Sequence, residues 1–197
     1  MERYVEVVPE WREKLGLNQK DADELLMPMY ETRMSAGCDF KCAEEVVVPS
    51  IWKAVGQVLV SDMRGFVNNW VARITGKELT EEQKITAKKF EPTLVHTGLR
   101  ARIMEDDVLE IYNRSSQPKN LGLVLANGVG VIDSDYYNNI DTKGEIMFAY
   151  YNFMPFDVRI ELGQRIGQGV IKKFYRFVNV QVKDVERTGG IGSTGIN

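Results

Sequence analysis

The 197-residue sequence is poor in cysteine and histidine, with only Cys38, Cys42 and His96. Two cysteines are too few for a disulfide framework, and a C-x3-C pair without companions is a poor zinc signature. We therefore expect both thiols to be reduced and packed, and the protein to be cytoplasmic. Because no serine or cysteine motif accompanies His96, we predict a structural role for it.

Long apolar runs and an excess of one charge are also missing. No run approaches the roughly 20 residues of a membrane helix, and the charged stretch MERYVEVVPEWREK lacks the apolar segment of a signal peptide. The net charge of −3 argues against a broad basic surface for nucleic acid. With 44% hydrophobic and 27% charged residues, the composition is typical of soluble globular proteins. We expect no membrane or nucleic-acid partner, although a few local donors could still hold a single nucleotide.

Short alternating runs separated by turn residues dominate the chain. Apolar and polar residues alternate in 97–103, 157–163 and 178–183. The runs 121–126 and 146–151 are more continuously apolar, which is typical of strands buried on both faces. These patterns predict an all-β domain built as a barrel, a sandwich or a jelly roll.

One stretch has helical rather than strand spacing. Its apolar residues are Ile51, Val55, Leu59, Met63, Phe66, Trp70 and Ile74. Gly76 is a stop signal, and a second helix is predicted from Thr80, with a capping box to Gln83, to about Phe90. Residues 51–91 are therefore predicted to be a helical hairpin inserted into a β domain formed by 1–50 and 92–186. A short helix is also predicted near 20–26.

The aromatic stripe of this insertion has to be buried against something. Trp52, Phe66 and Trp70 could pack on the partner helix, on the β domain or on a neighbouring subunit. Alternatively, they could form a platform for a partner protein, since aromatic residues are enriched at such surfaces.

Five short segments carry recognisable motifs. In chain order they are SAGCDF at 35–40, NRSS at 113–116, LANGVGVIDSDY at 125–136, GQRIGQ at 163–168 and RTGGIGSTG at 187–195. Together and in this order they resemble the five motifs of the trimeric dUTPase family, over residues 27–50 and 92–197. The resemblance implies a distorted jelly-roll, or β-clip, subunit. It also implies a homotrimer with shared active sites that hydrolyses dUTP to dUMP and pyrophosphate with Mg²⁺.

Within the third motif, the resemblance assigns Asp133 as the general base that activates water for attack on the α-phosphate. It places Tyr136 beneath the deoxyribose, where it would exclude a 2′-hydroxyl. From the residues alone, Asp133 and Asp135 could merely cap a hairpin turn, and Tyr136 could pack at a barrel rim.

Uracil recognition in this family uses a β-hairpin that imitates base pairing. The matching residues here are Asn127, Gly130, Val131 and Ile132. Gly128 and Gly130 would suit a close approach of the backbone to a ligand. Met147 matches a further substrate-contact position, and core filling is the alternative for it.

The remaining motifs match phosphate-binding positions. Arg114, Ser115, Ser116 and Gln168 are the expected phosphate donors. Arg165 is expected to form structural ion pairs near the subunit interface. Asp39 would either hold a water of the Mg²⁺ shell or buttress the site. No ligand cluster predicts a protein-held metal, and Mg²⁺ would arrive with the triphosphate.

The C-terminal segment 187–197 resembles a flexible lid over bound nucleotide. Arg187 would meet the γ-phosphate, and Gly192 and Ser193 would donate backbone N–H groups. Ile191 stands where the family usually has Phe, so we expect a weaker hold on the base. The second motif also departs from the family, because Gln117-Pro118 follows where Leu-Gly is usual.

Two rival functions remain open. A dCTP deaminase shares the fold, but 130–136 reads GVIDSDY and not the Trp-containing segment of that enzyme. A non-catalytic regulatory trimer that uses the insertion would fit Ile191 but not the intact Asp133 and Tyr136. For an enzyme, the family implies that one subunit gives 114–116 and Gln168, another gives 127–136, and the third gives the lid.

Overall fold

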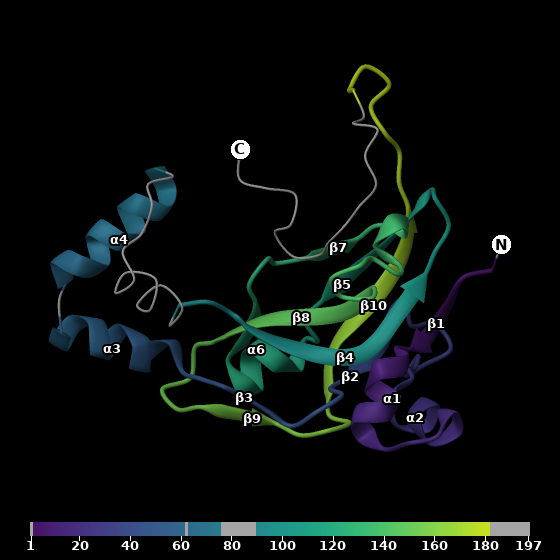
Figure 1. The fold of residues 1–197 in the computed structure, drawn as a ribbon, viewed down its shortest axis with the longest axis horizontal. Coiled ribbons are helices and arrows are strands. Elements are labelled where there is room, and N and C mark those ends of the chain that lie inside the picture. The colour runs from purple at the N-terminus through teal and green to yellow at the C-terminus, as the bar shows by residue number, and fades with distance from the viewer. Residues whose placement is uncertain (1, 62, 76–89, 182–197) are drawn as a thin grey trace.

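The computed structural model describes residues 2–61, 63–75 and 90–181, and the body of the chain is two antiparallel sheets that face each other (Figure 1). The first sheet has the order β1 (Tyr4–Val7), β4 (Thr93–Arg102), β8 (Glu145–Asn152), β6 (Leu123–Leu125). The second has the order β2 (Cys38–Lys41), β10 (Arg165–Lys173), β5 (Asp107–Tyr112), β7 (Gly130–Ile132). A smaller ladder joins β3 (Val46–Val48) to β9 (Val158–Ile160). The predicted all-β class is confirmed.

Aromatic side chains fill the space between the sheets. The ring of Phe40 on β2 lies 6.0 Å from that of Phe148 on β8, and both side chains are fully buried. Gly167 on β10 faces Phe148, because a Cβ there would lie 1.9 Å from the ring atom Cε1. The close approach of the two sheets therefore depends on a missing side chain.

Two helices at the N-terminus pack against the first sheet (Figure 1). Helix α1 (Pro9–Leu15) begins with Pro and ends at Gly16, and it buries Trp11. Helix α2 (Gln19–Leu26) begins after Asn18, whose side chain accepts a hydrogen bond from the Asp21 N–H at 3.0 Å. The predicted helix near 20–26 is confirmed, while α1 and β1 were not predicted.

The helical spacing after residue 50 is also confirmed, but the single helix expected over 51–74 is divided into two. These are α3 (Ile51–Ser61) and α4 (Met63–Thr75), which project to one side of the sheets in Figure 1. The second helix predicted, from Thr80 to Phe90, falls almost entirely outside the described residues. The division into a β domain, an insertion and a lid therefore stays a prediction. None of the helices described is both long and apolar enough to span a membrane.

One strand prediction was wrong, and the burial predicted for two other strands was wrong. The chain leaves the ladder at Lys173, and 178–181 form a turn in which Val178 is fully exposed. Alternation alone did not make a strand there, because no neighbouring strand pairs with these residues in the described part of the chain. The runs 121–126 and 146–151 contain β6 and β8, but burial alternates along both, and Val124 is 37% exposed. The outer face of this sheet is thus open in the single chain.

Candidate functional site

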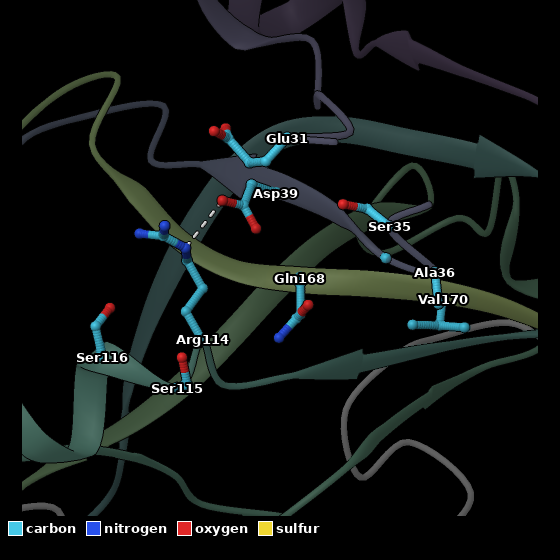
Figure 2. A pocket seen from close by; sticks show the side chains of 10 residues that line it. Glu31, Ser35, Ala36, Asp39, Arg114, Ser115, Ser116, Gln168 and Val170 are labelled. Atoms are coloured by element: carbon cyan, nitrogen blue, oxygen red, sulfur yellow. Dashed lines mark ion pairs between the residues drawn. The ribbon is translucent and has the colours of Figure 1, made fainter. Parts of the chain in front are cut away.

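A cavity of about 330 Å³ brings three of the sequence motifs together (Figure 2). Strand β10 causes this arrangement because it lies between β2 and β5. Its Gln168 pairs with Asp39 of β2 on one side and with Tyr112 of β5 on the other. The residues that line the cavity are Glu31, Ser35, Ala36, Gly37, Asp39, Arg114, Ser115, Ser116, Gln168 and Val170.

An ion-pair network crosses one side of this cavity. Arg114 Nε lies 2.9 Å from Asp39 Oδ2, and Arg165 Nη1 lies 3.5 Å from the same oxygen. Arg165 also contacts Glu31 Oε1 at 2.5 Å. Asp39 is only 7% exposed, so its buried charge is balanced by two guanidinium groups. This geometry agrees with the buttressing role for Asp39, and the alternative, that Asp39 holds a water of the Mg²⁺ shell, stays a prediction.

The segment Asn113–Ser116, hereafter the phosphate loop, joins β5 to helix α6 (Ser116–Leu121). The Gln168 side chain is tied to this loop, since its Nε2 donates to the Asn113 carbonyl at 3.2 Å. Ser115 is exposed, and the hydroxyls of Ser115 and Ser116 lie beside Arg114 in Figure 2. Guanidinium, amide and hydroxyl donors are thus gathered at one mouth, as suits a phosphate group.

The third motif lies elsewhere on the chain. Asp133 follows β7, whose Ile132 pairs with Leu109 near the start of β5, whereas Arg114 follows the end of β5. The separation along the strand direction is roughly 15 to 20 Å at about 3.3 Å per residue. Asp133 lines a different cavity, of about 370 Å³, with Glu105, Ser134, Asp135, Phe174 and Arg176. One chain therefore does not bring Asp133 and Arg114 to a common phosphate.

Tyr136 follows Asp135 of this cavity lining and is held firmly by hydrogen bonds. It is 9% exposed, its hydroxyl donates to the Glu145 carbonyl at 2.9 Å, and it accepts from the Thr142 hydroxyl at 3.0 Å. A 3-10 turn, Ser134–Tyr136, carries it. A ring fixed in this way can serve as a steric platform, and this is also the packing expected of a rim tyrosine.

The residues of the predicted uracil-binding hairpin, 127–132, differ in whether they are accessible to a ligand. Val131 is 61% exposed, and Gly128 has a φ of +69° with open space around it, so both are accessible to a ligand. Gly130 has a different reason to be glycine, because a Cβ there would lie 2.3 Å from Ile111 Cγ1. The interpretation of Gly130 as an opening for ligand is therefore not needed. Asn127 is exposed, and Ile132 is buried on the inner face.

Three further points concern residues singled out from the sequence. Met147 is half-buried and points away from the core face of β8, which does not support core filling within one chain. Both cysteines are free, with Cys42 buried and Cys38 half-buried. His96 bonds to Glu145 at 3.1 Å, in agreement with a structural role. The lid residues Arg187, Ile191, Gly192 and Ser193 lie outside the described part of the chain.

Sequence reasoning missed Glu31 and undervalued Gln117. No motif marks Glu31, and only the fold brings it to Arg165. Gln117 had been noted only as a departure from the family pattern, but it is a polar side chain that is just 2% exposed directly behind the phosphate loop. Within the described residues, no group of three or more His, Cys, Asp or Glu side chains could hold a metal ion.

Comparisons with known proteins agree with this geometry. The family model described as dUTPase matches residues 72–195. A deoxyuridine 5'-triphosphate nucleotidohydrolase from Lactococcus lactis is 42% identical over 121 residues, which cover 61% of this chain and 81% of that protein.

Solved structures show the same fold. A dUTPase from Streptococcus mutans matches with a TM-score of 0.60 at 28% identity, covering 88% of this chain and 97% of that one. A mutant dUTPase from phage phi11 of S. aureus, described with a structural Mg(II) ion, matches with a TM-score of 0.55 at 15% identity, covering 95% of this chain and 100% of that one. The predicted dUTPase-like β subunit is confirmed, and the chain belongs to the dUTPase family.

Proposed function

We propose that this protein hydrolyses dUTP to dUMP and pyrophosphate in a homotrimer with shared active sites. The observation that carries the proposal is the gathering of Arg114, Ser116 and Gln168 in one cavity, with Asp39 behind Arg114. Family membership supports the substrate. Free thiols suit a reducing compartment, so we propose a cytoplasmic location.

The role proposed for each motif in catalysis follows from its position in the fold. The first cavity offers donors to the β- and γ-phosphates, and Asp133 would accept a proton from the attacking water. Water oxygen bonds to the α-phosphorus, the bond to the bridging oxygen breaks, and pyrophosphate leaves. Because Asp133 and Arg114 are far apart in one chain, we propose that the 127–136 hairpin of one subunit meets the phosphate loop of another. The C-terminal segment of the third would contribute Arg187, Ile191, Gly192 and Ser193.

Base and sugar selection are assigned to the hairpin. Asn127, Gly130, Val131 and Ile132 would face uracil through backbone and amide groups, with Met147 as a further contact. Buried Tyr136 would leave no room for a 2′-hydroxyl, so UTP is expected to be a poor substrate. Cytosine would present donors where acceptors are required and would leave buried groups unpaired.

The side chains present fit a hydrated Mg²⁺ that the triphosphate carries. Asp39 is the carboxylate nearest the phosphate loop, and it would meet such an ion only through water because two arginines already contact it. When bound, the ion supplies charge neutralisation and fixes the phosphate chain. The protein's own donors, Arg114 and Gln168, orient the phosphates.

The experiment is a pyrophosphate-release assay with dUTP, dCTP, dTTP and UTP, run with Asp133→Asn as control. We expect release from dUTP alone and a loss of at least about a hundredfold in Asp133→Asn. Deamination of dCTP would favour the related deaminase. A wild-type protein without release from any of the four would favour the non-catalytic regulatory trimer.

A second role is proposed for residues 51–91, as an insertion that binds a partner protein. The observation is the exposure of Trp70 and Ile74 on α4, at 61% and 65%, and of Leu59 on α3, at 61%. Analytical ultracentrifugation of Trp70→Ser should show an intact trimer if this face serves another protein. Dissociation of the trimer would assign the face to a neighbouring subunit.

A further inference from the structure

Gln117 closes the phosphate loop from behind. The side-chain Oε1 of Gln117 accepts a hydrogen bond from the backbone N–H of Arg114 at 3.1 Å. The backbone N–H of Gln117 donates to the Arg114 carbonyl at 3.0 Å. The side chain is 2% exposed. A buried amide that satisfies a backbone donor in this way fixes the direction of the loop, since the alternative is an unpaired buried N–H group.

Tyr150 connects this closure to strand β10. Its hydroxyl donates its one proton to the Ile166 carbonyl, and Gln117 Oε1, at 3.3 Å, is a second and weaker acceptor for the same proton. The ring is 1% exposed and stacks on Phe148, with centroids 6.1 Å apart and 7° between the planes. Burial raises the pKa of the Tyr150 phenol well above its usual value, so the hydroxyl remains a donor at physiological pH.

The loop and β10 are also joined at a second point, where Gln168 Nε2 donates to the Asn113 carbonyl at 3.2 Å. Gln168 is therefore tied to the loop directly, and Ile166, on the other side of Gly167, is linked to it through Tyr150 and Gln117. The two groups expected to meet phosphate, on Arg114 and Gln168, belong to one hydrogen-bonded unit.

We propose that Gln117 and Tyr150 are positioning residues for dUTP binding, which hold the phosphate loop in register with β10. Neither residue touches the substrate, and both act through Arg114 and Gln168. The inference rests on the proposed function and extends it to residues outside the five motifs.

The test compares Gln117→Met, Tyr150→Phe and the double variant. Methionine keeps the length of the side chain and removes the acceptor, and phenylalanine keeps the stacked ring and removes the hydroxyl. We expect the KM for dUTP to rise about tenfold or more in Gln117→Met, with a much smaller change in kcat, because a misplaced loop weakens phosphate binding. Tyr150→Phe should show a smaller rise. The double variant should resemble Gln117→Met, because the two residues form one unit.

Two further measurements separate positioning from general destabilisation. Inhibition by deoxyuridine, which has no phosphate, should be unchanged in Gln117→Met. Ser50→Ala is the matched control, since Ser50 is 2% exposed and its hydroxyl donates to the Met154 carbonyl at 2.6 Å, at the base of α3. It should lose stability without any change in KM.

Each outcome has one meaning. An unchanged KM in Gln117→Met, in an enzyme whose wild type releases pyrophosphate, overturns the positioning role and leaves the proposed function intact. Equal losses for dUTP and deoxyuridine also overturn it. A wild-type protein without turnover counts against the proposed function instead. In that case, calorimetry would measure the binding of tripolyphosphate. Weaker binding to Gln117→Met, but not to Ser50→Ala, would still support the positioning role.

Discussion

Arg114 follows the last residue of strand β5, whereas Asp133 lies near the other end of that strand, one residue past the Ile132–Leu109 pair. The antiparallel pairing of β7 with β5 fixes this separation, because Ile132 pairs with Leu109 and Gly130 with Ile111. Hydrogen bonds to phosphate require about 3 Å. Within one chain, Arg114 and Asp133 are therefore too far apart to contact one phosphate group, in line with the proposed sharing of the site between two subunits.

Replacing Gly167 by Ala should destabilise the protein by about 1–3 kcal/mol, because the new Cβ would collide with the Phe148 ring in a filled core. Urea unfolding measures this loss. Adding Phe148→Leu should restore part of it. Gly56→Ala in α3 is the control, since nothing lies within 4 Å of its Cβ position, and a helical alanine should stabilise slightly. A Gly167→Ala protein as stable as wild type would contradict the packing described.

Asp107 anchors the N-terminus to β10. Its carboxylate is 1% exposed, and it contacts Arg3 Nε at 2.5 Å and Lys173 Nζ at 3.0 Å. Asp107→Asn should cost about 1–3 kcal/mol at neutral pH, because the buried side chain loses its charge-assisted hydrogen bonds to Arg3 and Lys173, whose own side chains are about half exposed. The neighbouring Asp106→Asn is the control, and it should cost less than about 0.5 kcal/mol because Asp106 is 65% exposed.

The Asp107 carboxylate also determines in which direction the stability of the fold changes with pH. Hydrogen bonding to Arg3 holds the pKa of Asp107 well below its usual range. Its contribution is therefore present above the ordinary carboxyl pKa and is lost as the pH falls through the folded-state pKa. The stability difference between wild type and Asp107→Asn should begin to narrow as the pH falls below about 4 and should go on narrowing toward the folded-state pKa. A difference that is constant down to about pH 2 would disagree with this assignment.

The contribution of His96 to stability should change with pH in the opposite direction, and be lost as the pH rises. Its hydrogen bond to Glu145 raises the pKa of the imidazole, with help from Glu44 and against burial and Lys14. The contribution is full below about pH 6.5 and is lost as the pH rises through the folded-state pKa. Urea unfolding of wild type and His96→Gln should differ by up to about 1 kcal/mol at about pH 5.5 and by less at about pH 8.5. A difference that grows with pH would refute the ion pair.

Ile191→Phe should tighten binding of a non-hydrolysable dUTP analogue about twofold to tenfold, because an aromatic ring adds stacking on uracil. Isothermal titration calorimetry gives the affinity. Ile196→Phe adds the same ring outside the motif and should change nothing. Equal affinities for Ile191→Phe and wild type would show that this position does not meet the base.

The sequence predicted the elements with strong periodicity and the motifs with fixed spacing. Alternation in 97–103 marked β4, and helical spacing marked α3 and α4, because each pattern reflects one buried face. The same alternation failed at 178–181, since a strand requires a neighbour that the pattern does not specify. Helix α1 was missed although Pro9 and Gly16 delimit it, because seven residues give little periodicity.

The site was predictable only in part. Motif resemblance marked Arg114, Gln168 and Asp133 and implied that different subunits supply them, but the β5 register that separates them within one chain became visible only in the fold. The partners of Asp39 and the closure by Gln117 depend on side chains that meet from strands far apart in the sequence. Such contacts follow from the fold and not from local spacing.

The most direct test of the shared site mixes two inactive chains, Arg114→Ala and Asp133→Asn, by refolding them together from denaturant. If each site takes its phosphate loop from one subunit and its Asp133 from another, random mixing should restore about a quarter of wild-type pyrophosphate release. Each variant refolded alone should remain inactive. A mixture as inactive as its components, with mixed trimers shown by mass spectrometry, would contradict the account.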